Sequence, residues 1–248
     1  VKVCSQMNIS AVIHNNQQID FINQIKPKNP INIHLKINTG MNRLGFPPSK
    51  VKSLIQSLET SPYIGNIILM THFANADEAI GIQDQLALFN TIVDDSFDRS
   101  VANSAAIIRY PETHMEWVRP GIMLYGASPF EDQSSKDIGL QPVMSLHSNI
   151  IAVQNLDKGQ SVGYGSTFVA TNKTRVGIVA CGYADGYPRH APSGTPVMVA
   201  GKISRTLGRV SMDMLYVDLT DIPSADIHSE VELWGANISV DEVAKEAK

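Results

Sequence analysis

The chain has 248 residues, of which 43% are hydrophobic, so it can bury a large core and belongs to neither a disordered nor a fibrous class. Its 20 basic and 24 acidic residues give a net charge of -4 without basic runs, which argues against nucleic acid as a partner. No apolar run approaches the roughly 20 residues that cross a bilayer, the first residues form no secretion signal, and two cysteines suit a reducing compartment. We expect a cytoplasmic protein that binds no membrane and no metal.

Both ends of the chain have the character of interior sequence. The chain has no initiator Met, and residues 9–15 already form a predicted buried strand. At the other end, a capping box from Ser239 to Glu242 opens a helix that continues to Lys248. We therefore expect the chain to be cut off at both ends.

Short apolar strands alternate with helical patterns from residue 9 to about 125, which is typical of parallel βα units. The predicted strands are 9–15, 31–38, 66–73, 100–103 and a short one near Val118. Between them, apolar residues recur at helical spacing near 19–22, 51–58 and 82–93. No strand is followed by G-x-G-x-x-G, so the pattern favours part of a (β/α)8 TIM-type barrel over a Rossmann sheet.

After about residue 132 the helical pattern ends, and short β-rich runs bounded by Gly, Pro and Asn begin. The predicted strands are 143–154, 175–180, 196–199, 214–219 and 231–233. The polar stretch 131–139 is the expected linker. The sequence therefore predicts a partial barrel over 1–131 and a C-terminal, mostly β domain over 132–248.

The strand 31–38 alternates between an apolar face and a polar face that carries His34 and Lys36. In a parallel barrel the polar face points inward, and active sites lie at the carboxyl ends of the strands. A solvated edge strand is the alternative. The turn that follows, TGMNRLG, presents Arg43, whose planar guanidinium suits an anionic group.

Further polar residues follow the later strands of the predicted barrel. His72 ends the next strand, although a histidine there can also be a hydrogen-bonded core residue. Ser104 lies where a strand ends and a helix begins, so it offers a hydroxyl to a phosphate or simply caps the helix. Arg119 and Gly121 close the barrel section, where late loops often bind phosphates.

Seven segments in order resemble the successive motifs of the alanine racemase family: HLKINTGMNRLG, THFANADE, VANSAAI, WVRPGIMLYG, VGYGSTFVA, CGYADGYPRH and LGRVSMDM. They cover almost the whole chain. The resemblance implies an isomerase that uses pyridoxal 5'-phosphate (PLP) to interconvert L-alanine and D-alanine, which supplies D-alanine for peptidoglycan. It also implies a homodimer in which each active site draws residues from both subunits.

Racemisation removes a proton on one face of the substrate and returns one on the other, so two bases are expected. By the resemblance, Tyr164 matches the catalytic tyrosine base and serves the partner subunit's site, and His72 and Arg119 match residues hydrogen-bonded in line with it. Arg119 also matches the arginine on the pyridine nitrogen of PLP. Arg43 matches a contact to the phenolic oxygen and the substrate carboxylate. Lys36 matches a lysine that the family often carries as a carbamate, although it can also extend its amine to solvent.

The resemblance also implies binding residues for the cofactor and the substrate. Ser104, Gly121 and Ile122 match phosphate-binding positions. The positions at the substrate entrance and carboxylate site are matched by Tyr183, Met212 and Asp213.

Three residues of the family pattern have no counterpart in this sequence: the PLP-binding lysine, a phosphate-binding tyrosine near it, and a C-terminal tyrosine. We therefore expect the 248 residues alone to be inactive, as a non-catalytic fragment. A racemase of wider substrate range, a class that is often exported, is the alternative function. A decarboxylase with a PLP-binding barrel is disfavoured, because VGYG and SMDM resemble racemase motifs.

Overall fold

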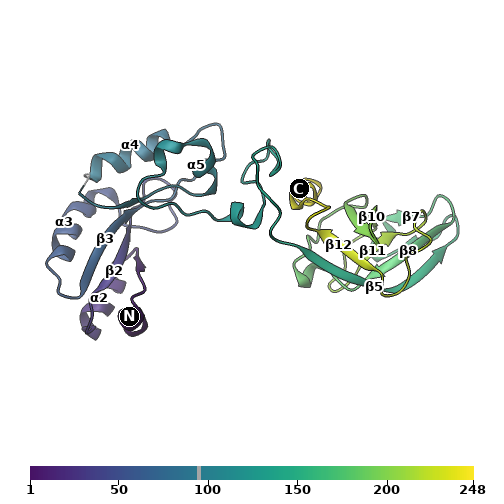
Figure 1. Cartoon of the computed structure of the whole chain (residues 1–248), viewed down its shortest axis with the longest axis horizontal. Helices are drawn as coiled ribbons and strands as arrows, with labels where there is room; N and C mark the ends of the chain where they lie inside the picture. The colour runs from purple at the N-terminus through teal and green to yellow at the C-terminus, as the bar shows by residue number, and fades with distance from the viewer. Residues whose placement is uncertain (94–95) are drawn as a thin grey trace. The chain divides into compact units, whose positions relative to one another are not determined.

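The computed structural model describes residues 1–93 and 96–248. The chain divides into two compact units, Val1–Gly121 and Ile122–Lys248, and Figure 1 labels many of their helices and strands. No helix within the described residues is both long and apolar enough to cross a membrane.

The N-terminal unit is built on a four-stranded sheet in the order β1-β2-β3-β4, with every neighbouring pair parallel. Figure 1 labels its two central strands, β2 and β3. Its strands are β1 (Ala11–Ile13), β2 (Ile31–Lys36), β3 (Ile64–Met70) and β4 (Arg99–Ser100). The fifth strand predicted near Val118 is reduced to a parallel bridge between Ser100 and Trp117. Beside this bridge, the N–H groups of Trp117 and Arg119 donate to the carbonyls of Arg99 and Ala102 at 3.1 and 3.0 Å.

Strand β2 has the alternation that the sequence predicted. Ile31, Ile33, Leu35 and Ile37 are buried, whereas the intervening Asn32, His34, Lys36 and Asn38 are half-buried. Because β2 pairs with β1 on one side and β3 on the other, it is an interior strand and not a solvated edge. Its polar residues therefore lie on the face opposite the one that packs in the core.

Helices connect the strands of this sheet. They are α2 (Asn16–Ile25), α3 (Pro48–Glu59), α4 (Gln83–Ile92) and α5 (Ser104–Arg109), and a short α1 (Lys2–Met7) precedes β1. Asn15 and Gln18 form a capping box that starts α2, and Pro48 stands in the first turn of α3, where its missing N–H costs nothing. Each long helix buries apolar residues on one face, among them Ile22, Val51 and Phe89.

Six described strands of the C-terminal unit form a closed antiparallel barrel in the order β10-β11-β8-β5-β12-β9. They are β5 (Leu146–Leu156), β8 (Thr174–Val179), β9 (Pro196–Val199), β10 (Lys202–Leu207), β11 (Leu215–Asp218) and β12 (Glu230–Trp234). A small hairpin pairs β6 (Ser161–Val162) with β7 (Phe168–Val169), and α6 (Val240–Glu246) follows the barrel. The barrel encloses a core that includes Ile150, Val197, Leu215 and Leu233.

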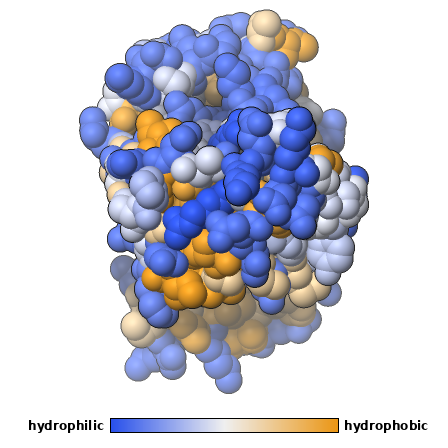
Figure 2. Space-filling model, turned by 90° about the vertical axis from the view of Figure 1, so that its right-hand side faces the viewer, coloured by the Kyte–Doolittle hydropathy of each residue, from blue (hydrophilic) through white to orange (hydrophobic). Residues whose placement is uncertain are grey.

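Strand β10 is not predicted by the sequence pattern, because its residues alternate only weakly in hydropathy. Ile203 in β10 is 72% exposed, whereas Leu207 at its end is buried. Ala200 and Gly201 form the two-residue turn of a hairpin that joins β9 to β10, and both have positive φ. The glycine at position 201 was the signal in the sequence for this turn. Figure 2 shows a largely hydrophilic surface with smaller apolar patches, of the kind that an exposed Ile produces.

The first unit ends at Gly121 and the second begins at Ile122, whereas the sequence predicts the domain boundary between residues 131 and 132. The segment after Ile122 belongs to the C-terminal unit because α6 holds it. The N–H groups of Ser128 and Ser135 donate to the carboxylate of Asp241 at 3.0 and 2.6 Å. Charged acceptors of this kind make strong hydrogen bonds, so the polar linker predicted from composition is an anchored segment over part of its length.

Candidate active site

The loop after β2 presents Arg43 in a fixed conformation. The N–H groups of Gly40 and Asn42 donate to the side-chain oxygen of Asn38 at 3.2 and 3.0 Å, which folds the loop on itself. Gly45 has φ +125, and a Cβ there would lie 2.8 Å from the backbone nitrogen of Asn38. Only glycine fits this turn, so its sequence fixes how the arginine is presented.

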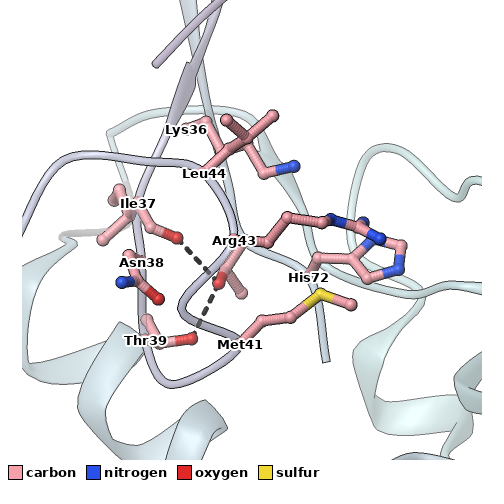
Figure 3. Close-up of a pocket in the computed structure, with 9 residues that line it drawn as sticks. Lys36, Ile37, Asn38, Thr39, Met41, Arg43, Leu44 and His72 are labelled. Atoms are coloured by element: carbon pink, nitrogen blue, oxygen red, sulfur yellow. Dashed lines mark hydrogen bonds between the residues drawn. The ribbon is translucent and has the colours of Figure 1, made fainter. Parts of the chain in front are cut away.

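Lys36, Arg43 and His72 line one pocket at the carboxyl ends of β2 and β3, and Figure 3 shows their side chains on the same side of the loop. The structure thus places His72 beside Lys36 and Arg43, which lie on the preceding strand and loop. None of the described residues that line this pocket is acidic. The pocket therefore favours an anionic ligand.

The guanidinium of Arg119 donates hydrogen bonds to residues at or just after the ends of two different strands of the N-terminal sheet. One terminal nitrogen donates to the carbonyl and the hydroxyl of Ser100 at 2.7 and 2.6 Å. The other donates to the carbonyl of Thr71 at 2.6 Å and lies 3.4 Å from Nδ1 of His72. Because a guanidinium only donates, Nδ1 is the acceptor, and a neutral His72 then carries its proton on Nε2.

The cations around His72 set the protonation of the pocket. Burial, followed by the charges of Arg119, Lys36 and Arg43, lowers the pKa of His72 to about 4. Burial and then the charges of Arg43 and Arg119 also lower the pKa of Lys36. Burial lowers the pKa of Arg119 to about 10, which leaves it protonated at neutral pH. Near pH 7 the site thus holds fixed positive charge around a neutral imidazole.

Ser104 and Gly121 lie together at the end of the N-terminal unit. The N–H of Gly121 donates to Oγ of Ser104 at 2.7 Å. The cap of α5 is Asn103, whose side chain accepts from Ala106, so Ser104 is the first helical residue and not the cap. Ile122, the third phosphate-binding candidate, begins the short 3-10 helix η2 (Ile122–Tyr125) in the other unit.

Tyr164 lies in the C-terminal unit and begins the 3-10 helix η3 (Tyr164–Ser166). Its side chain is 72% exposed, although its turn is held on both sides. A Cβ at Gly163 would lie 2.9 Å from the ring of Tyr216, and one at Gly165 would lie 3.3 Å from the guanidinium of Arg209. A fixed turn therefore presents an exposed phenol.

The remaining candidates lie on two loops that are hydrogen-bonded to each other. Tyr183 begins the 3-10 helix η4 (Tyr183–Asp185), and its N–H donates to the carbonyl of Ser211 at 3.0 Å. The N–H of Ala184 donates to the carbonyl of Met212 at 2.8 Å, which places Met212 and Asp213 beside η4. The structure thus groups Tyr183 with Met212 and Asp213, while Tyr164 has a turn of its own.

Sequence reasoning missed the polar residues that hold the site from behind. Ser100 and Thr71 accept from Arg119, and Gln85 donates to the carbonyl of His72. Their signal in the sequence is weak, because a single Ser, Thr or Gln in an apolar stretch has no distinguishing spacing. No group of three or more metal-ligating side chains occurs in the part of the chain that the structure describes.

Two family models match the chain: the alanine racemase N-terminal domain over residues 1–129 and the alanine racemase C-terminal domain over residues 143–248. An alanine racemase of Thiobacillus denitrificans is 49% identical over 248 residues, which are 100% of this chain and 68% of that protein. A catabolic alanine racemase of Klebsiella aerogenes is 50% identical over 244 residues, 98% of this chain and 68% of that protein. The chain belongs to the alanine racemase family.

Solved structures of alanine racemases agree with this membership. The biosynthetic enzyme of Pseudomonas aeruginosa has a TM-score of 0.90 and 45% identity, with 98% of this chain and 69% of that chain covered. The predicted fold class, a partial TIM-type barrel followed by a mostly β domain, is confirmed. The model of the N-terminal domain ends at residue 129, before the predicted boundary between 131 and 132, and the model of the C-terminal domain begins after it, at residue 143. Because alanine racemases are isomerases, membership of this family makes the protein an isomerase.

The depressed pKa of His72 predicts a pH dependence of folding. An unfolded histidine titrates near pH 6.5, whereas His72 in the folded chain titrates near 4. Between these values the unfolded chain binds a proton that the folded chain does not, so lowering the pH from 6.5 to 4 destabilises the fold. Between pH 7.5 and 5, we expect the free energy of unfolding to fall less in His72→Asn than in the wild type. The measurement is urea unfolding at each pH, followed by NMR signals of the N-terminal unit. Equal losses in the two proteins would show that His72 is not the titrating group.

Proposed function

We propose that this protein interconverts L-alanine and D-alanine with PLP by a two-base mechanism, and so supplies D-alanine for peptidoglycan. The observation that carries the proposal is the pocket lined by Lys36, Arg43 and a neutral His72, whose Nδ1 lies 3.4 Å from the guanidinium of Arg119. Its relatives are named alanine racemases at 49% and 50% identity. We also propose a cytoplasmic location and a homodimer.

The residues present fit PLP, whose phosphate and phenolic oxygen are anionic. The pocket is lined by cations without an acidic residue among the described lining side chains. Ser104 and Gly121 form a second candidate binding site, where the glycine would let a phosphate approach the backbone closely. We propose that Ser104, Gly121 and Ile122 hold the phosphate and that Arg119 faces the pyridine nitrogen. When bound, PLP supplies an electron sink for the negative charge left at the α-carbon.

The protein's own residues then position the substrate and move its proton. Arg43 binds the carboxylate of alanine, because a guanidinium pairs with both of its oxygens. Tyr164 takes the α-proton of L-alanine on its phenolic oxygen. His72 accepts from Arg119 on Nδ1, so its Nε2–H is left to donate to Tyr164 of the partner subunit, which favours the phenolate. Near neutral pH the imidazole stays uncharged and acts as this donor.

We propose that Tyr164 serves the active site of a partner subunit. An aromatic side chain that is 72% exposed on a fixed turn is suited to contact another surface. The loops of Tyr183, Met212 and Asp213 then form the substrate entrance and the carboxylate site. By the resemblance of the sequence motifs, no lysine of this sequence corresponds to the PLP-binding lysine, and we therefore propose that the 248 residues alone are inactive.

The direct test measures interconversion of the alanine enantiomers by the complete enzyme with and without PLP. Activity on alanine that depends on PLP supports the proposal. A much higher kcat/KM for several larger amino acids would identify a racemase of wider range instead. Release of carbon dioxide without a change of configuration would reject racemisation.

We further propose that Lys36 is a carbamate in the complete enzyme. A carbamate forms from the neutral amine and carbon dioxide, and burial with Arg43 beside it favours both the neutral amine and the anion that replaces it. We expect Lys36→Ala to reduce activity about tenfold, by leaving Arg43 without an anion to brace it. Added chloride or a short carboxylate should partly restore the activity.

Lys52→Ala is the matched control, because Lys52 is an exposed lysine on α3. It should leave both activity and the response to chloride unchanged. A density map of the complete enzyme in which Lys36 is a bare amine, with no anion near Arg43, would rule out the carbamate.

A further inference from the structure

Gln85 is a buried polar residue on α4, the helix that follows the strand end carrying His72. Its side-chain oxygen accepts from the N–H of Ala74 at 2.8 Å. Its side-chain nitrogen donates to the carbonyl of His72 and to the hydroxyl of Thr39, both at 3.2 Å. One amide therefore contacts two separate loops, the one after β3 and the one after β2.

The hydroxyl of Thr39 also hydrogen-bonds to a residue just after the end of β3. It lies 2.7 Å from the hydroxyl of Thr71, which donates to the carbonyl of Ile37 at 2.9 Å, and Figure 3 draws both hydrogen bonds. Since a hydroxyl has one proton, Thr71 accepts from Thr39, and Thr39 accepts from Gln85. The donors therefore run in one direction, from Gln85 through Thr39 and Thr71 to Ile37.

This direction fixes the orientation of the Gln85 amide. Its nitrogen must face Thr39 and the carbonyl of His72, because both are acceptors, and its oxygen must face the N–H of Ala74. The loop also packs directly on the side chain, since a Cβ at Gly40 would lie 3.3 Å from Cγ of Gln85. Every polar atom of the amide thus has a partner, as a buried amide requires.

The two loops that Gln85 joins carry the pocket's side chains. Gly40 lies three residues before Arg43 in the loop after β2, and His72 itself accepts from Gln85. The carbonyl of Thr71, the residue before His72, accepts from Arg119 at 2.6 Å. The strand end at His72 is therefore held by Arg119 on one carbonyl and by Gln85 on the next.

We propose that Gln85 is a positioning residue of the active site, which fixes the distance between Arg43 and His72 by hydrogen-bonding the loop of one to the backbone of the other. This role rests on the proposed racemase function. Gln85 acts through Thr39 and the His72 carbonyl and needs no contact with the substrate. A displacement of about 1 Å between a substrate-binding arginine and the histidine that donates to the base can cost a hundredfold in rate, so a residue without substrate contact can affect catalysis.

The test compares Gln85→Leu and Gln85→Glu with Gln83→Leu, in which an exposed glutamine of the same helix is replaced. Leucine removes all three hydrogen bonds. Glutamate keeps the acceptor for Ala74 but loses both donors and sets its oxygen against the carbonyl of His72. In the complete, PLP-loaded enzyme we expect both Gln85 variants to lose roughly tenfold to a hundredfold in kcat for alanine, with a smaller change in KM. Gln83→Leu should match the wild type.

A second measurement separates positioning from a merely structural role. The pKa of His72, followed by NMR of the imidazole, should rise in the Gln85 variants, because the ring moves away from Arg119 and toward water. Thr39→Val breaks the contact at its other end without altering α4, and should change kcat and the His72 pKa in the same direction by less. This variant keeps the test open if Gln85→Leu does not fold.

Folded Gln85 and Thr39 variants with the wild-type kcat and the wild-type His72 pKa would overturn the proposal. So would a loss of activity in which the His72 pKa stays unchanged. If the wild type does not racemise alanine, the proposed function fails by itself, while the His72 titration still shows whether Gln85 couples the two loops.

Discussion

Tyr164→Phe is expected to reduce removal of the α-proton from L-alanine by about a hundredfold to ten-thousandfold, the usual range for a general base. Phenylalanine keeps the ring but has no oxygen to take the proton. The turn itself should survive, because Gly163 and Gly165, and not the phenol, set its conformation against Tyr216 and Arg209. PLP binding should therefore be unchanged.

The measurement is exchange of the α-hydrogen for deuterium, followed separately for each enantiomer. If Tyr164 is the base on one face only, exchange from L-alanine falls much more than exchange from D-alanine. Tyr63→Phe, which removes a phenol outside the proposed site, should leave both rates unchanged. Equal losses for the two enantiomers would show that Tyr164 does not act as the base of one face.

The two-domain organisation could be predicted from the sequence because burial in this chain follows simple periodicities. The residues of β2 alternate in hydropathy and are alternately buried and half-buried, so this interior strand and its polar face were predictable. The lengths of short strands were not. The strand predicted over 100–103 is observed as β4, which is only Arg99–Ser100, because an apolar run in the sequence does not show where strand pairing ends.

The loops that carry Arg43 and His72 were predictable because parallel strands end at the same edge of a sheet. The contacts behind them were not. The hydrogen bond between Gln85 and Thr39 joins residues 46 positions apart, and that between Thr39 and Thr71 joins residues 32 apart. Such pairing depends on how two loops and a helix pack, and neither hydropathy nor spacing encodes it.

The protonation of the site also depended on the fold. The sequence placed Lys36 and Arg43 near each other, and in the structure the pKa of Lys36 is lowered by burial and then by the charge of Arg43. It could not predict that the largest influence on the pKa of His72 is burial, ahead of Arg119. All these influences lower the pKa of His72, to about 4, so the imidazole is neutral at neutral pH and can act as a hydrogen-bond donor.

Arg119→Met is expected to destabilise the N-terminal unit by about 3 kcal/mol and to abolish most of the activity. The carbonyls of Ser100 and Thr71 lose charged donors at 2.7 and 2.6 Å, and a hydrogen bond to a charged group contributes about 1.5–3 kcal/mol. Methionine fills much of the volume of the arginine stem but satisfies neither carbonyl. Arg205→Met, at an exposed ion pair with Asp218, should cost under about 1 kcal/mol.

The His72 titration distinguishes the loss of charge from the loss of packing. Removing Arg119 removes the second-largest cause of the low His72 pKa, so that pKa should rise from about 4 toward 6.5 in Arg119→Met. Arg119→Lys keeps a positive charge with fewer donors in a different geometry. It should therefore leave the His72 pKa low while still losing stability and activity. Urea unfolding and imidazole NMR of the two variants measure these effects, and a His72 pKa that rises equally in both would show that the charge of residue 119 does not hold the imidazole neutral.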